Sequence, residues 1–292
     1  MRGNPAMHDL VAPGSLGAVL NLLAAEPGAW TPIAGGTELM VAFAAGKLSA
    51  PKLVSLWGIP ELRAIETKAE SVVIGAAATF LDLRKHPIIA AELPLLAKAA
   101  SWIGSIANQS RATIGGNLVN GSPAADSSPA LLACDAEIEM ISVRGSRRIP
   151  YCEFHTGYKQ NVLAADELLF AIHLPRRFAR HKQYLRKVGT RRAMAIAKVA
   201  LGATALLEKG EVREIRLGAA SLAPFPTRLW QTEAALRRKA LTRETVQAAR
   251  KTLLAEVKPI DDIRSTAVYR RRVAANLLDE FLLALCREES HS

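Results

Sequence analysis

The sequence predicts an α+β protein with two domains, a binding domain of residues 1–176 and a smaller C-terminal domain of residues 177–292. Residues 111–129 are rich in Gly, Ser, Asn and Pro, which predicts a binding loop rather than a helix or a buried strand. A second double glycine, Gly35-Gly36, follows a strand-like run. After residue 180, three strand-like segments are followed only by helix-like segments, which predicts a separate α+β unit. We expect the first domain to divide again at about residue 57.

The first subdomain is predicted to contain a β-α-β unit. A helix is expected over residues 15–25, because apolar residues at helical spacing follow a Ser and end before Pro27-Gly28. A strand at 30–34 then leads into the glycine turn. Thr37 is expected to cap the next helix, which ends near Gly46, and residues 52–56 form a buried strand.

The second subdomain is expected to alternate strands and short helices. Residues 71–79 predict a strand that enters a small-residue turn, followed by a short helix that ends at Pro87. Residues 93–107 are apolar on most faces and predict one buried helix, opened by Pro94. After the central loop we expect a strand at 137–143 with its return, and a last strand at 166–175.

The C-terminal domain is expected to combine a small antiparallel sheet with three helices. Strands are predicted over residues 181–190, 197–208 and 211–221, the last two joined as a hairpin by a Lys-Gly-Glu turn. Amphipathic spacing predicts helices over residues 227–239, 243–257 and 268–288.

Composition excludes several classes of protein. Half of the 292 residues are hydrophobic, which is enough for a sizeable core. No apolar run reaches the roughly 20 residues of a membrane span, and the N-terminus lacks the apolar core of a secretory signal, so we expect a cytoplasmic protein. The net charge of +11 by itself suggests nucleic-acid binding. However, the basic segments 176–192 and 269–273 lack the interleaved aromatic residues that stack on bases. A solvated face, an acidic partner or an anionic cofactor is a better explanation.

The sequence offers no set of side chains for metal binding or acid–base catalysis. Cys134, Cys152 and Cys286 are widely separated, and they do not match an iron–sulfur pattern. The six histidines show no metal-binding spacing. We find no Ser-His-Asp set or paired carboxylates, so we expect neither a metal site nor catalytic residues in the narrow sense.

The two double glycines predict a site for a nucleotide-like ligand. Gly115 and Gly116 lack a Cβ, so their backbone is free to adopt positive φ and to turn successive N–H groups toward an anion. Thr113, Asn117 and Ser122 add neutral hydrogen-bonding groups, and Asp126 is placed to accept from hydroxyls such as those of a ribose. At the other double glycine, the helix expected to start at Thr37 favours phosphate. A long diphosphate ligand held from two sides explains both segments.

These residues resemble a known family. AGGTELM at 34–40 and ATIGGNLVNGSPAADSSPALLACDA at 112–136 are similar to the FAD-binding subunit of the xanthine dehydrogenase and carbon monoxide dehydrogenase class of molybdenum hydroxylases. The similarity extends over nearly the whole chain. It includes residues 154–175, 187–203 and DIRSTAVYRRRV at 262–273.

The resemblance implies a PCMH-type FAD-binding domain and a flavoprotein-like C-terminal domain. It implies that the two glycine segments hold the FAD pyrophosphate, with Asp126 toward the adenosine ribose, Lys187 at the flavin nucleotide and Leu169 nearby. The cofactor-binding residues that it implies are Ile33, Ala34, Gly35, Gly36, Thr37, Glu38, Leu39, Thr113, Ile114, Gly115, Gly116, Asn117, Asp126, Leu169 and Lys187. One departure is that Ala107, Asn108, Gln109 and Ser110 stand where the family usually has Gln-Ile-Arg-Asn. Any contact that this Arg makes in the family, to the flavin or to a neighbouring subunit, is therefore missing here unless Arg111 supplies it.

The resemblance also implies partners. A large subunit with molybdopterin would oxidise the substrate, and a small subunit with two [2Fe-2S] clusters would pass electrons to FAD on this chain, in a dimer of heterotrimers. The acceptor could be NAD⁺, oxygen or a quinone, and the substrate is left open. Two other functions stay open at this stage. One is a standalone flavin oxidase of the vanillyl-alcohol type, against which the small C-terminal domain without a covalent-flavin His or Cys motif argues. The other is a nucleotide-sensing or scaffold protein.

Overall fold

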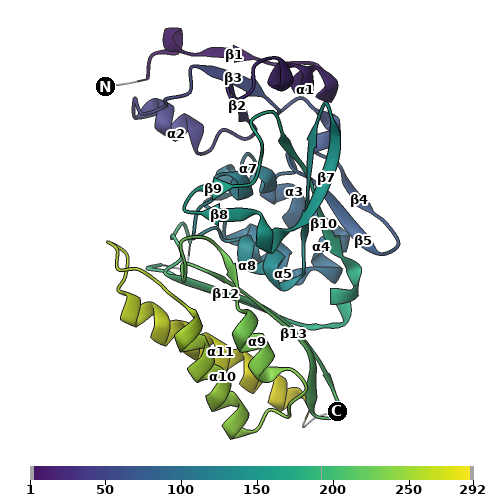
Figure 1. Ribbon diagram of the computed structural model, residues 1–292, viewed down its shortest axis with the longest axis vertical. Coiled ribbons are helices and arrows are strands. Elements are labelled where there is room, and N and C mark those ends of the chain that lie inside the picture. The colour runs from purple at the N-terminus through teal and green to yellow at the C-terminus, as the bar shows by residue number, and fades with distance from the viewer. Residues whose placement is uncertain (1–2, 192, 290–292) are drawn as a thin grey trace.

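The computed structural model describes residues 3–191 and 193–289. Figure 1 shows three units stacked along the long axis, an N-terminal unit, a middle unit and a C-terminal unit. This arrangement confirms the predicted α+β class. The domain boundaries at about residue 57 and at residue 176 stay a prediction.

The N-terminal unit is a three-stranded parallel sheet in the order β1-β3-β2. Its elements are β1 (Asp9–Val11), α1 (Leu16–Ala25), β2 (Trp30–Ile33), α2 (Leu39–Ala44) and β3 (Lys52–Ser55). Ser15 caps α1 as predicted, since its hydroxyl accepts a hydrogen bond from the N–H of Ala18 at 3.2 Å. The β2-α2-β3 crossover is also confirmed. The predicted cap at Thr37 is wrong, because α2 begins only at Leu39 and Glu38 occupies the cap position.

The middle unit is a five-stranded antiparallel sheet in the order β4-β5-β10-β6-β7, covered by short helices. Its strands are β4 (Ile65–Thr67), β5 (Ser71–Gly75), β6 (Glu137–Ser142), β7 (Gly145–Pro150) and β10 (Leu168–Pro175), with a small hairpin of β8 (His155–Gly157) and β9 (Gln160–Asn161). Its helices are α3 (Phe80–Lys85), α4 (Pro87–Glu92), α5 (Pro94–Trp102), α6 (Ile106–Gln109), α7 (Ile114–Val119) and α8 (Ser128–Ala133). The largest buried apolar cluster of the described residues lies between the sheet and these helices.

Two predictions for the middle unit are wrong. The single helix expected over residues 93–107 is divided, because α5 ends at Trp102 and the chain turns through Gly104 at a φ of 46° before α6 begins. The segment expected to be a loop at 111–129 contains all of α7 and the start of α8. Gly115 and Gly116 therefore lie within α7 rather than in an extended turn, whereas Gly121 follows the helix at a φ of 62°.

The C-terminal unit is a four-stranded antiparallel sheet in the order β11-β12-β13-β14, with α9, α10 and α11 on one face. Its elements are β11 (Lys182–Val188), β12 (Val199–Glu208), β13 (Glu211–Ala220), β14 (Thr227–Arg228), α9 (Trp230–Leu236), α10 (Arg243–Glu256) and α11 (Ala267–Glu289). The predicted β12-β13 hairpin and the three helices are confirmed. The turn of the hairpin uses Lys209 and Gly210, both at positive φ.

The other face of this sheet packs on α8 of the middle unit. A Cβ on Gly202 or on Gly218 would lie 2.5 Å from the carbonyl oxygen of Pro129, so only glycine permits this approach. Thr204 donates a hydrogen bond to the carbonyl of Ala133 at 2.7 Å. Next to it, the carboxylate of Asp135 binds the guanidinium groups of Arg216 at 2.9 Å and Arg228 at 2.6 Å. The two units are therefore joined by close backbone packing and by partly buried charges.

Candidate ligand-binding site

A cavity of about 520 Å³ lies where the N-terminal unit meets the middle unit, which is in the size range of small-molecule sites. Three chain segments form most of its wall: the turn between β2 and α2, the start of α7, and the stretch that joins β9 to β10. Because these segments are far apart in the sequence, the cavity exists only in the folded chain.

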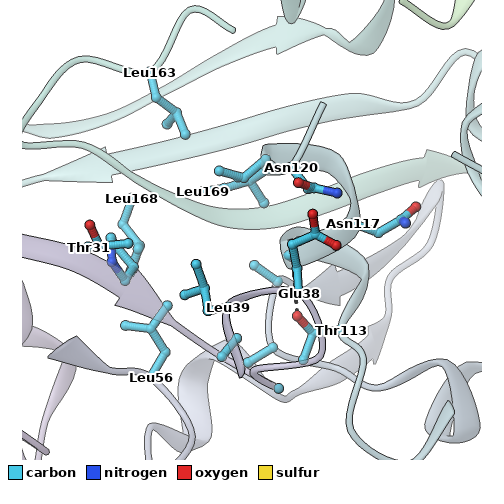
Figure 2. Close-up of a pocket in the computed structure, with 18 of the residues that line it drawn as sticks. Thr31, Glu38, Leu39, Leu56, Thr113, Asn117, Asn120, Leu163, Leu168 and Leu169 are labelled. Carbon is cyan, nitrogen blue, oxygen red and sulfur yellow. Dashed lines mark hydrogen bonds between the residues drawn. The ribbon is translucent and has the colours of Figure 1, made fainter. Parts of the chain in front are cut away.

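The cavity has a polar part and an apolar part (Figure 2). Glu38, Thr113, Asn117 and Asn120 lie together on one side, while Thr31 and the leucines at 39, 56 and 168 lie on the other. Leu169 lies between the two groups. A ligand that fits both parts needs a hydrogen-bonding end and an extended apolar end.

The first glycine segment touches the second through the backbone. A Cβ on Gly35 would lie 1.7 Å from the carbonyl oxygen of Arg111, so no other residue fits there without moving one of the two segments. Gly36 adopts a φ of 71°, which L side chains rarely adopt. These two glycines let the turn after β2 lie directly against the approach to α7.

The turn after β2 also offers unused hydrogen-bond donors. Within residues 3–191 and 193–289, no acceptor is found for the backbone N–H groups of Gly35, Gly36, Thr37 and Glu38. All four residues line the cavity. Backbone N–H groups left without a protein partner are normally satisfied by water or by a ligand. Four consecutive donors fit the anion site that was predicted for this segment.

The second glycine segment works differently from the prediction. Gly115 and Gly116 are not at positive φ, and their N–H groups are already used, by the carbonyl of Ala76 at 2.8 Å and by the hydroxyl of Thr113 at 3.1 Å. Gly115 is required for packing, because its Cβ would lie 2.6 Å from the Cβ of Ala76. The expected second anion nest is therefore wrong, and the glycines bring α7 close to the strand end at β5.

Asn117 supplies the polar group that α7 turns toward the cavity. Its side-chain oxygen accepts a hydrogen bond from the Ser127 hydroxyl at 2.6 Å, which fixes the orientation of the amide. The side-chain NH₂ group then remains as a donor at the cavity wall. No hydrogen bond from this group is found among the described residues.

Asp126 and Lys187 form a buried ion pair beside the cavity rather than in its wall. The Nζ of Lys187 lies 2.6 Å from Asp126 Oδ2, and the two side chains are 10% and 12% exposed. Burial raises the pKa of Asp126 to about 6, although the Lys187 ammonium lowers it. The other carboxylate oxygen, Oδ1, is buried and has no hydrogen-bond partner in the described chain.

Each member of the ion pair is connected to a residue of the cavity wall through one intervening residue. Ser127, next to Asp126, holds the cavity residue Asn117. Lys187 also lies 3.5 Å from the carbonyl of Trp102, and the next residue, Ile103, lines the cavity. A hydroxyl group that reached this corner would find an unpaired buried acceptor at Asp126.

The segment that departs from the family pattern is held by other contacts. Gln109, at the place of the family's Arg, is buried and binds Arg84 at 3.2 Å and the Ser101 carbonyl at 3.1 Å. Arg111 does not line the cavity, and its guanidinium lies 3.8 Å from the ring centre of Trp57, which does not line it either.

No Lys or Arg lines the cavity among the described residues, and each of its two carboxylates lies near a cation outside the lining. Glu38 lies 3.6 Å from Lys159, and Glu167 binds Arg147 at 2.7 Å. An anionic ligand would therefore be held mainly by backbone and amide donors.

Most of the residues predicted for the site share this cavity. Ala34, Gly35, Gly36, Thr37, Glu38, Leu39, Thr113, Gly115, Gly116, Asn117 and Leu169 line it. Ile33, Ile114, Asp126 and Lys187 do not; Ile114 is a core residue. Lining residues that were not predicted include Thr31 and Asn120, beside the glycine motifs, and Asn161, Leu163 and Leu168, in the family-like segment 154–175. Polar residues next to a glycine motif were the available signal.

Comparison with known proteins identifies the two parts of the chain. Residues 6–177 match the family described as FAD binding domain in molybdopterin dehydrogenase, and residues 184–285 match the CO dehydrogenase flavoprotein C-terminal domain. The chain is 34% identical to the xanthine dehydrogenase FAD-binding subunit of Escherichia coli O157:H7, over 88% of each chain. It is 30% identical to the carbon monoxide dehydrogenase medium chain of Hydrogenophaga pseudoflava, over 96% of this chain and 97% of that one. The solved structure of carbon monoxide dehydrogenase from the same organism superposes with a TM-score of 0.90, at 31% identity, over 95% of this chain and 96% of that one.

Proposed function

Because this chain belongs to the family of the FAD-binding domain in molybdopterin dehydrogenase, we propose that it transfers electrons between partner subunits and an external acceptor. As a member of this family it is an oxidoreductase, the FAD-binding subunit of a molybdenum hydroxylase. Bound FAD would supply the redox chemistry, because a flavin can take up electrons singly and release them in pairs. The chain contributes binding, orientation and electrostatics. The observation that carries the proposal is the row of unused N–H donors at residues 35–38, beside a cavity with one polar and one apolar part.

We assign the polar part of the cavity to the pyrophosphate. The N–H groups of Gly35, Gly36 and Thr37 would donate to its oxygens, and the amide of Asn117 would donate from the facing wall. The carboxylate of Glu38 lies 3.6 Å from the ammonium of Lys159, and the backbone N–H of Glu38 is a fourth available donor. Neutral donors suit a pyrophosphate because their hydrogen bonds to a charged acceptor are stronger than neutral ones.

The apolar part would receive a ring system. The leucines at 39, 56, 168 and 169 provide an apolar surface without charged groups, which is the usual lining of a small-molecule site. Asp126 would accept from a ligand hydroxyl through its free Oδ1, and its partner Lys187 would keep a positive charge close to the cofactor. These assignments rest on the cavity lining and on family membership together.

The partners proposed for the complex are a large subunit with molybdopterin and a small subunit with two [2Fe-2S] clusters, assembled as a dimer of heterotrimers. The relatives named above are subunits of enzymes called xanthine dehydrogenase and carbon monoxide dehydrogenase, which supports a multi-subunit assembly. The proposed acceptor is NAD⁺, oxygen or a quinone.

The experiment that tests this function is rapid anaerobic mixing of the FAD-loaded chain with the reduced iron–sulfur subunit of its own complex. We expect the flavin absorbance to fall at a rate that rises with the concentration of the iron–sulfur subunit. FAD that is bound but stays oxidised, although dithionite reduces it, would contradict the electron-transfer role.

A further inference from the structure

The stretch that joins β9 to β10, residues 162–167, forms one wall of the cavity, and we call it the wall loop. It contributes four lining residues, which are Leu163, Ala164, Ala165 and Glu167. Figure 2 shows Leu163 on the opposite side of the cavity from Leu56, which follows β3 of the N-terminal unit. Because three of its four lining residues are apolar, the wall loop belongs to the part of the cavity that we assign to the ring system.

Few backbone hydrogen bonds from the described residues fix the wall loop, because it lies between β9 and β10 and belongs to neither strand. The N–H of Val162 donates to the carbonyl of Phe154 at 3.1 Å. In the middle of the loop, the carbonyl of Ala165 accepts from the N–H of Gly28, in the N-terminal unit, at 3.2 Å. A segment outside the sheet opens more readily than the strands beside it unless side chains hold it in place.

Arg147, on β7, binds the first and the last residue of the wall loop. Its Nε and Nη2 donate to the two carboxylate oxygens of Glu167, each at 2.7 Å. Nη2 also donates to the carbonyl of Val162 at 2.9 Å. Within the loop, the Glu167 carboxylate accepts from the N–H of Ala164 at 2.9 Å. An Arg–carboxylate contact with two parallel hydrogen bonds adds geometric specificity as well as energy, so this contact favours one position of the loop.

The Glu167 carboxylate depends on Arg147 more than a surface carboxylate would. Its side chain is 8% exposed, whereas that of Arg147 is 43% exposed. The hydrogen bonds from Arg147 lower the pKa of Glu167, although burial raises it, so the carboxylate is charged at neutral pH. Without Arg147, a charged and nearly buried group would lose its cation, which is more costly than breaking a surface ion pair. We expect the loop then to move outward, so that water reaches Glu167.

A second arginine of the β6-β7 hairpin binds the neighbouring residue of the loop. Both Nη atoms of Arg144 donate to the carboxylate of Asp166, one of them at 3.0 Å. Asp166 does not line the cavity. Arg147 is therefore the arginine of this hairpin whose carboxylate partner lies in the cavity wall.

We propose that Arg147 is a positioning residue for the cofactor: it holds the wall loop against the apolar part of the cavity and thereby slows the release of bound FAD. This inference rests on the proposed function. Arg147 does not line the cavity, so it acts through Glu167 and the loop and not by touching the ligand. The N–H donors at residues 35–38 belong to a different wall, so the site assigned to the pyrophosphate should not depend on Arg147.

The test compares Arg147→Gln with Arg148→Gln in the full chain. Arg148 is the matched control, because it follows Arg147 on β7 and carries the same charge, but its side chain lies 3.6 Å from Glu139 of β6. No contact between Arg148 and the wall loop is found in the described chain. We expect Arg147→Gln to release FAD about tenfold faster or more, measured by flavin fluorescence after rapid dilution. Its affinity for ADP, which lacks the flavin ring, should stay within about twofold of the parent, and Arg148→Gln should match the parent in both measurements.

Two further measurements separate positioning from a general loss of stability. Hydrogen exchange of residues 161–168 in the FAD-free chain should be faster in Arg147→Gln than in the parent or in Arg148→Gln. Arg147→Lys keeps the charge but cannot make two parallel hydrogen bonds, so its rate of FAD release should lie between those of the parent and Arg147→Gln. Arg147→Lys also carries the comparison if Arg147→Gln unfolds below the assay temperature.

Three outcomes would overturn the inference. One is release of FAD from Arg147→Gln at a rate within about twofold of the parent. Another is an equal acceleration in Arg148→Gln, which would assign the effect to charge alone. The third is a loss of ADP affinity as large as the loss of FAD affinity, which would show that the whole site and not the wall loop had changed. Failure of the proposed function is distinguishable, because the unaltered chain would then bind no FAD or would accept no electrons, whereas the hydrogen-exchange comparison needs neither.

Discussion

Gly35→Ala should separate the two glycine segments and weaken FAD binding. The added Cβ would lie 1.7 Å from the Arg111 carbonyl oxygen and 2.5 Å from its carbon, both backbone atoms. Ordinary contact begins at 3.4 Å, so one segment must move by about 1.7 Å, the difference between 3.4 and 1.7 Å. A shift of this size in the turn would displace the row of N–H donors.

The magnitude follows from two effects. Forcing one extra carbon into a packed contact costs about 1–3 kcal/mol of folding free energy. Misplacing two or more of the four donors removes hydrogen bonds to a charged acceptor, each contributing about 1.5–3 kcal/mol. We therefore expect FAD affinity to fall by about a hundredfold or more, since 1.4 kcal/mol is a factor of ten.

Urea unfolding and equilibrium titration with FAD measure the two effects separately. Gly17→Ala is the control, because nothing lies within 4 Å of its added Cβ and the residue is in α1. That variant should be more stable by about 0.5–1 kcal/mol with unchanged FAD affinity. FAD affinity in Gly35→Ala within about twofold of the parent would refute the assignment of this turn to the pyrophosphate.

Three further predictions concern buried charges. Lys187→Gln should make the potential of bound FAD more negative and Asp126→Asn should make it more positive, because each variant removes one charge of the pair; equal potentials in a redox titration would remove the electrostatic role. Without FAD, the unfolding free energy of the parent relative to Asp126→Asn should fall as pH rises between about 4 and 6 and then level off, because the unfolded carboxyl ionises near 3.8 and the folded one near 6. The slope should reach about 1.4 kcal/mol per pH unit, and a rising difference in urea titrations would contradict the pKa shift. Glu233→Leu should cost about 3–5 kcal/mol by leaving buried Arg228 without its main partner, whereas Glu208→Leu, in an exposed pair, should cost about 1 kcal/mol or less; similar losses on thermal unfolding would contradict the role of burial.

Much of the fold follows from local sequence patterns. Ser15 before an apolar helix, the Lys-Gly-Glu turn between β12 and β13, and the three amphipathic C-terminal segments each carry a local signal, and each is confirmed. The family-like segments then identified the class of cofactor, which local patterns alone left open between several nucleotide-like ligands.

The errors share a physical cause, which is tertiary contact overriding local preference. Gly115 and Gly116 disfavour a helix by themselves, but α7 forms because Ala76 and Thr113 accept the N–H groups of these glycines and only glycine fits against Ala76. The helix expected over 93–107 is divided by Gly104, whose positive φ could not be read from an apolar run.

Pairings across long sequence distances were also out of reach. Asp126 and Lys187 each appeared as a separate candidate for the cofactor, whereas the structure joins them as one buried pair 61 residues apart in sequence. The N–H groups of residues 35–38, which have no acceptor in the described part of the chain, likewise depend on the folded shape of that turn.

The most direct test of the account is the amount and identity of flavin bound by the unaltered chain at equilibrium, with ADP and FMN as competitors. We predict one FAD per chain, displaced by ADP more readily than by FMN, because the donors assigned to the pyrophosphate lie in the polar part of the cavity. A folded chain that binds no FAD, or that binds FMN as tightly as FAD, would contradict it.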